Sequence, residues 1–259
     1  MKKISLIILA LLATSCAPEK NISKNYDKEL QKQIEKSLQQ EDFAEAIKIY
    51  EDLAAKNPDN REYQLVYANS LRMSGYVEKA KAVYSKLLER NIKDVDAIEG
   101  KALCFLSEGN FNEARKLFSD VLRLDATRWR AMNGLAVAFS LDKEIGVAME
   151  YYNSALEISP NNPSILNNIG LSYAFNGDYQ KAIMNLQKAS SFVETGSNKK
   201  KKIDMNLSLV YGVKGDMQKA EDILKGYMEA KAVYETLSLY AKLKNDNKLA
   251  KSYLNKALR

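Results

Sequence analysis

The sequence predicts an all-α, right-handed superhelical solenoid built from about seven helix-turn-helix repeats. Alanine recurs at a fixed step of 34 residues, at positions 46, 80, 114, 148 and 182. A second column, small in four of its five members, lies twelve residues earlier: Ile34, Ala68, Ala102, Ala136 and Gly170. Because two helices approach closely only where neither carries a bulky side chain, the two columns predict the crossing of two helices in each repeat.

Two further features recur in the same register. Four residues after each alanine stands a large apolar side chain: Tyr50, Tyr84, Phe118, Tyr152 and Leu186. These side chains are expected to fill the space between neighbouring repeats. Gly75, Gly109 and Gly177 fall between the two helices, where a left-handed cap favours glycine, whereas Lys143 takes that place in the fourth repeat. A period of 34 residues with these columns is typical of tetratricopeptide (TPR) repeats.

The register divides the solenoid, residues 27–259, into repeats near 27–60, 61–94, 95–128, 129–162, 163–200, 201–230 and 231–259. Ala220 follows Ala182 by 38 residues and Ala250 follows Ala220 by 30, so four residues are inserted and the last connection is four residues short. The insertion contains the run Lys199–Lys202. We expect a solvated loop there, and a docking site for an acidic partner or anionic head groups is the alternative.

The amino-terminal residues predict a lipoprotein signal peptide over residues 1–15. Lys2 and Lys3 precede an apolar stretch of about ten residues, which is too short to span a bilayer. Small residues then lead to Cys16, as in a bacterial lipobox. Cys16 is therefore the expected lipidation site, residues 16–26 are the lipidated tether, and Ala17 favours the periplasmic face of the outer membrane. An ordinary secreted protein and an uncleaved anchor are the alternatives.

The composition argues against an enzyme. The chain contains no histidine, which removes the commonest general base and most zinc sites, and it has no glycine-rich phosphate loop. We therefore predict no catalytic residue, no metal and no cofactor. Lysines and acids are interspersed, without the pattern typical of nucleic-acid binding. With Cys16 lipidated, Cys104 is the single remaining thiol, and it is expected to be a small buried residue.

The first helices of a TPR solenoid line a concave groove, and the register predicts which side chains point into it. The predicted partner-binding groove residues are Asn133, Asn167, Asn168, Leu171, Phe175, Asn206, Leu209 and Val213. Exposed asparagines can bind the backbone of an extended peptide, because each amide both donates and accepts, while the apolar neighbours would select side chains. The alternative is that the aliphatic residues pack between adjacent first helices and that asparagine merely suits helix starts.

Three segments resemble one particular family: Trp129–Ala138, Pro160–Ala174 and Asn206–Gly215, followed by the shortened connection. They are similar to the TadD-type TPR lipoproteins of tight-adherence (Flp) pilus assembly, with Lys143 and the lysine insertion as departures. The resemblance implies a pilotin-like scaffold on the outer membrane that binds a secretin or pilus subunit. A type IVa pilotin, or a periplasmic adaptor that recruits cell-wall enzymes or folding factors, remains an alternative.

Overall fold

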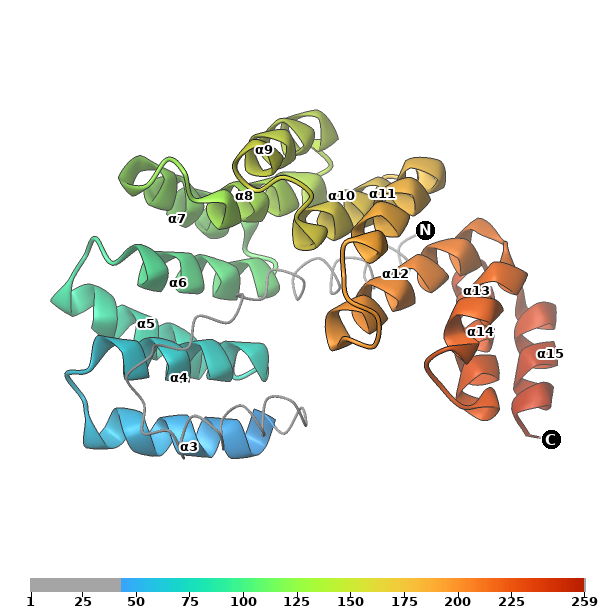
Figure 1. Cartoon of the computed structure of the whole chain (residues 1–259), viewed down its shortest axis with the longest axis horizontal. Helices are drawn as coiled ribbons and strands as arrows, with labels where there is room; N and C mark the ends of the chain where they lie inside the picture. Colours follow the sequence, from blue (N-terminus) through green and yellow to red (C-terminus); the bar gives the residue numbers. More distant parts are fainter. Residues whose placement is uncertain (1–42, 259) are drawn as a thin grey trace. The chain divides into compact units, whose positions relative to one another are not determined.

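The computed structural model describes residues 43–258, which contain thirteen α-helices and no strand (Figure 1). The helices are α3 (Phe43–Lys56), α4 (Arg61–Met73), α5 (Val77–Arg90), α6 (Val95–Ser107), α7 (Phe111–Leu124), α8 (Trp129–Leu141), α9 (Ile145–Ile158), α10 (Pro163–Phe175), α11 (Tyr179–Ser191), α12 (Asn198–Lys214), α13 (Met217–Lys225), α14 (Ala230–Leu243) and α15 (Asn247–Ala257). The predicted all-α class is confirmed for this part of the chain. The predicted signal peptide (1–15), Cys16, the tether (16–26) and Ile34 lie outside the described residues.

The helices alternate as the period requires. From residue 61 onward, first helices (α4, α6, α8, α10, α12 and α14) alternate with second helices (α5, α7, α9, α11, α13 and α15). Helix α12 begins at Asn198, and α14 begins at Ala230, so each starts before the repeat bound expected from the period. The described residues belong to two compact units, 43–138 and 139–258, which we treat separately. The small columns are buried as predicted, with Ala68, Ala102, Ala114 and Ala182 all at 0% exposure. Close helix crossing therefore explains why these positions stay small.

The turns inside the repeats use left-handed backbone. Gly75, Gly109 and Gly177 have φ values of 84°, 77° and 84°. Lys143, at the same place in its repeat, adopts φ 66°, and Asn245 adopts φ 62° in the last repeat. The turn geometry is thus kept where the sequence departs from glycine, at a cost of about 1–2 kcal/mol for the lysine.

The large side chains of the second helices fill the space between repeats, as predicted. The Tyr84 and Phe118 rings are both at 0% exposure. A Cβ atom added to Gly134 of α8 would lie 2.4 Å from Cζ of Phe118, and one added to Gly100 of α6 would lie 2.3 Å from Cζ of Tyr84. Each ring therefore occupies the position that a side chain on the following first helix would need.

The four inserted residues lengthen a helix, so the prediction of a loop at Lys199–Lys202 is wrong. The lysines lie in the first turns of α12, which has 17 residues where α10 has 13. Ser197 caps this helix by accepting a hydrogen bond from the Lys200 backbone at 3.2 Å. Lys200 is half-buried, and its Nζ donates to Oγ of Ser190 at 2.5 Å. The cap and this contact allow the helix to start early.

Cys104 lies inside α6 at 0% exposure, which confirms the prediction of a small buried residue. Burial raises the pKa of its thiol to about 12. Because the thiolate is the nucleophilic form, this side chain is an unreactive part of the core at neutral pH.

Candidate partner-binding face

The predicted groove asparagines of α10 and α12 bond to one another. Nδ2 of Asn206 donates to Oδ1 of Asn167 at 2.8 Å, and Nδ2 of Asn167 donates to Oδ1 of Asn168 at 3.3 Å. We call Asn167, Asn168 and Asn206 the asparagine ladder. Their exposed fractions are 2%, 0% and 2%. The ladder therefore ties two successive first helices together through buried amides, whose hydrogen-bonding groups need partners away from water.

The expectation that these asparagines are exposed is wrong, and it is also wrong for Asn133 on α8, which is 3% exposed. Leu171, Leu209 and Val213 are buried as well, at 0%, 4% and 4%. The first helix α12 contacts both α10 and α14, so packing between first helices accounts for the burial of Leu171, Leu209 and Val213, as the alternative interpretation of the sequence had it for the aliphatic residues. A direct role of these residues in binding a partner stays a prediction.

Phe175 differs from the other seven predicted groove residues because part of its side chain is accessible. It is the last residue of α10, where Asn176 follows as the C-cap. Two residues earlier on the same helix, the Tyr173 ring lies 5.2 Å from Nζ of Lys181. In residues 139–258, Phe175 is thus the predicted side chain that a partner can still contact.

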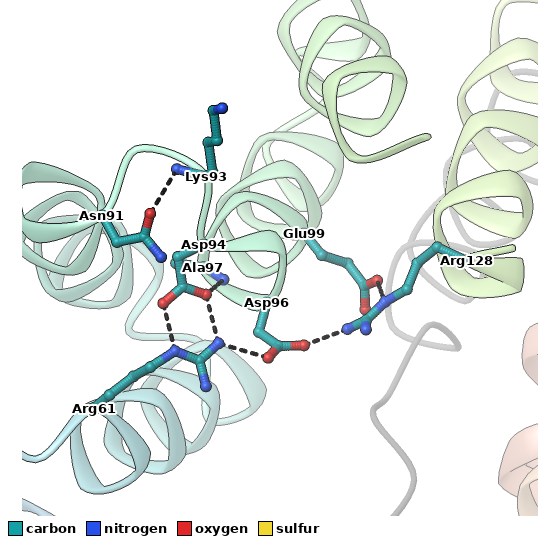
Figure 2. A network of polar contacts seen from close by, with 8 residues as sticks. All are labelled: Arg61, Asn91, Lys93, Asp94, Asp96, Ala97, Glu99 and Arg128. Atoms are coloured by element: carbon teal, nitrogen blue, oxygen red, sulfur yellow. Dashed lines mark hydrogen bonds and ion pairs between the residues drawn. The ribbon is translucent and has the colours of Figure 1, made fainter. Parts of the chain in front are cut away.

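A chain of ion pairs crosses the starts of three first helices in residues 43–138 (Figure 2). We call its members the charged edge: Arg61, Asp94, Asp96, Glu99 and Arg128. Asp94 caps α6 by accepting a hydrogen bond from the Ala97 backbone at 3.1 Å. The two oxygens of the same carboxylate accept hydrogen bonds from Nε and Nη2 of Arg61, each at 2.6 Å. This forked geometry is the strong form of an arginine–carboxylate pair.

The network continues through Asp96 to α8. Arg61 donates to Oδ2 of Asp96 at 2.7 Å, and Arg128 donates to the other oxygen of the same carboxylate. Nε of Arg128 also donates to Oε2 of Glu99 at 2.7 Å. Arg61 begins α4, the acids belong to α6, and Arg128 directly precedes α8. The charged edge therefore holds the amino-terminal ends of α4, α6 and α8 together.

Two acids of α6, Asp96 and Glu99, bind Arg128, and their pKa values are shifted in opposite directions. Burial acts to raise the pKa of the Asp96 carboxyl, but the hydrogen bonds from Arg61 and Arg128 outweigh it and leave that pKa below its usual value. Burial dominates at Glu99, which is 7% exposed, and raises its pKa despite the opposing charge of Arg128. Of these two acids, Glu99 is therefore the one whose charged form is disfavoured by burial, with the charge of Arg128 opposing that effect.

The charged edge combines buried and accessible groups. The Asp94 side chain is 1% exposed, whereas those of Arg61 and Asp96 are 47% and 44% exposed. The buried acids fix the helices, and the accessible arginine and aspartate can exchange hydrogen bonds with a polar partner segment. The apolar columns that define the repeats contain none of these charged residues, so they do not indicate this network. The available signal was opposite charge at a spacing near one repeat, as in Arg61 with Asp94 and Asp96 with Arg128.

Residues 43–258 contain no cluster of acidic, cysteine or histidine side chains that could hold a metal ion. Within the same range, no helix is long and apolar enough to cross a membrane.

Three family models with the description tetratricopeptide repeat match residues 37–103, 99–163 and 151–184, which together make up more than half of the chain. No curated protein sequence matches the chain. A solved tetratricopeptide repeat protein from Parabacteroides merdae ATCC 43184 is 12% identical, with a TM-score of 0.59, over 90% of this chain and 98% of that one. A thermophilic TPR protein from Thermus thermophilus is 20% identical, with a TM-score of 0.56, over 76% and 98%.

The described helices thus pair into helix-turn-helix repeats, a fold that typically serves as a protein-interaction scaffold. The chain belongs to the tetratricopeptide-repeat proteins. Repeats of this kind generally bind protein or peptide partners, so the coarse prediction of a protein-binding scaffold agrees with the comparisons. The two similar structures are too distant in sequence to indicate a particular partner.

Proposed function

We propose that this chain is a lipid-anchored protein-binding scaffold on the periplasmic face of the outer membrane. The observation that carries the proposal is the uninterrupted series of helix pairs from Arg61 to Ala257, preceded by a sequence with the pattern of a lipobox at Cys16. A repeat solenoid offers an extended surface and a lipid supplies a fixed location. Its task is to help assemble a pilus of the tight-adherence type or the associated secretion channel.

The physical advantage of such an arrangement is effective concentration. A cysteine carrying a diacylglyceryl group and an N-acyl chain buries many methylenes, each contributing about 0.8 kcal/mol, so the anchor is long-lived. A partner subunit held by the solenoid then stays close to the membrane in which it assembles, without additional contacts. The half-exposed Arg61 and Asp96 of the charged edge and the accessible part of Phe175 are the proposed points of contact.

Cross-linking on intact cells followed by mass spectrometry tests the assembly role. The proposal expects a secretin or pilus-assembly subunit among the products captured with the wild-type chain. Capture of cell-wall enzymes or folding factors instead would support the adaptor alternative and contradict the role in pilus assembly. Capture of type IVa pilus components would support the other pilotin alternative.

Replacing the proposed lipidated residue gives the test of the anchor. Cys16→Ser should abolish incorporation of a labelled fatty acid, because serine lacks the thiol on which the thioether forms. The variant should also accumulate as unprocessed or mislocalised protein. Metabolic labelling and membrane fractionation measure both effects.

Cys104→Ser is the matched control, because Cys104 is a buried thiol inside α6. It should retain the wild-type label and location. Wild-type protein that carries no label and fractionates with the soluble periplasm would contradict the anchor.

A further inference from the structure

The last repeat leaves uncovered a position that every earlier described repeat buries. Four residues after the alanine of each second helix, the side chain is at 0% exposure in five successive repeats: Tyr84, Phe118, Tyr152, Leu186 and Leu224. The equivalent residue of α15, Leu254, is 42% exposed. A large apolar side chain thus stands in a stacking position with no helix of residues 43–258 over it.

The earlier members of this column show what normally covers them. The Phe118 ring fits against Gly134 on the following first helix. The Tyr152 hydroxyl lies 2.9 Å from Oγ of Ser172 on α10, again the following first helix. Helix α13, which carries Leu224, likewise contacts α14. The covering element is in each case a helix, so the surface around Leu254 has the form that accepts another helix.

Leu254 lies beside a hollow of about 250 Å³ between α14 and α15. Its lining residues are Ser238, Lys242, Asn247, Ala250, Lys251 and Leu254. The Ser238 hydroxyl donates a hydrogen bond to the Ala250 carbonyl at 2.9 Å, and the apolar side chains of the lining are Ala250 and Leu254. The hollow is smaller than the roughly 300–1,000 Å³ of small-molecule sites, and it suits one or two side chains of a docked helix.

The rim of the hollow is basic. Lys242 on α14 and Lys251 on α15 are exposed at its edge. Residues 230–258 as a whole contain six lysines but only two acids, Glu235 and Asp246. An occupant that brings carboxylates to this rim gains attraction from both lysines, whereas a basic occupant is repelled.

We propose that the surface formed by α14 and α15 binds an acidic amphipathic helix of a partner protein, stacked on the solenoid as an additional first helix. An aliphatic side chain of that helix enters the hollow next to Leu254, and its acidic residues face Lys242 and Lys251. A second copy of this chain is a poor occupant, because the same lysines would then face each other. This surface is separate from the predicted groove on the first helices.

The test uses the purified full chain and two synthetic helical peptides. One peptide carries leucine at the a and d positions and glutamate at e and g of three heptads, and the other has lysine in place of every glutamate. Fluorescence anisotropy should show that the glutamate peptide binds and that the lysine peptide binds at least about tenfold more weakly. Leu254→Ser should weaken the glutamate peptide by about tenfold or more, because an apolar contact is lost.

Leu239→Ser is the matched control, because Leu239 is an exposed leucine of α14 outside the hollow. It should leave binding of the glutamate peptide unchanged, and both variants should melt like the wild type. Equal binding of the two peptides, or equal loss in the two variants, would overturn the proposal. Self-association, or binding to anionic vesicles, that depends on Leu254 while the glutamate peptide fails to bind would also overturn it.

Discussion

Phe118→Ala is expected to destabilise the protein by about 3–5 kcal/mol, the usual cost of removing a buried ring. Phe118 is fully buried and fills the space between α7 and the start of the next repeat at Gly134. The midpoint of denaturant unfolding, followed by helical circular dichroism, measures the loss. Leu124→Ala in the same helix is the control, because Leu124 is 43% exposed and should change stability by less than about 1 kcal/mol.

The partner glycine makes this test specific for stacking. Gly134→Ala should destabilise although alanine is intrinsically better in helices by about 1 kcal/mol, because the added Cβ would lie 2.4 Å from Cζ of Phe118. Combining Gly134→Ala with Phe118→Leu should cost less than the sum of the two single changes. Strict additivity, or a stabilising Gly134→Ala, would mean that the ring does not occupy this position.

Arg128→Ala is expected to cost about 3 kcal/mol at neutral pH, because it leaves Glu99 buried without its cation and removes one of the two arginines that bind Asp96. Arg123→Ala is the control. Arg123 is 78% exposed, its ion pair with Asp120 lies on the surface of α7, and its removal should change stability by less than about 1 kcal/mol.

The pH dependence of this loss has a definite sign. Glu99 has a raised pKa in the folded protein, so the folded state holds its proton more tightly and stability falls as pH rises from the usual glutamate value to the folded one. The charge of Arg128 lowers the pKa of Glu99. Removing Arg128 therefore raises that pKa further and extends to higher pH the range over which stability falls. The lowered pKa of Asp96 acts in the opposite sense, because its stabilisation is lost as pH falls below the usual aspartate value.

The loss caused by Arg128→Ala should therefore be larger at pH 8 than at pH 5, where Glu99 can accept a proton. Denaturant unfolding at the two pH values measures the difference between variant and wild type. A loss that is equal at both pH values would show that Glu99 does not depend on Arg128.

The repeat period was sufficient to predict most of the fold. Positions such as Ala114 and Phe118 recur in the sequence because the same contacts between helices recur in each repeat. The period also located the turns, including the one at Lys143. The backbone at Lys143 is left-handed because the turn requires that conformation, although lysine does not favour it. The length of α12 was misjudged because a run of lysines resembles a solvated loop. The segment is helical, with Ser197 as its N-cap and the half-buried Lys200 bonded to Ser190.

The candidate site was less predictable, because a period shows which residues are equivalent but not how deeply each is covered. Asn167 and Asn206 are polar and were therefore expected to be exposed. Their amides instead form a hydrogen bond with each other between α10 and α12. The two residues are 39 positions apart in the sequence, so no local pattern indicates this pairing. For the charged edge, opposite charges spaced near one repeat offered a signal, but the burial of Glu99 against Arg128 arises only when α6 and the start of α8 come together.

Site-specific photo-cross-linking in cells tests most directly the claim that the first helices bind a partner protein. A photoreactive phenylalanine analogue is placed at Phe175, the accessible predicted residue of α10, or at Met184, which is 66% exposed on the second helix α11. We expect a discrete cross-linked product from position 175 and little from position 184, in protein that melts like the wild type. A product from position 184 with none from position 175 would contradict the claim.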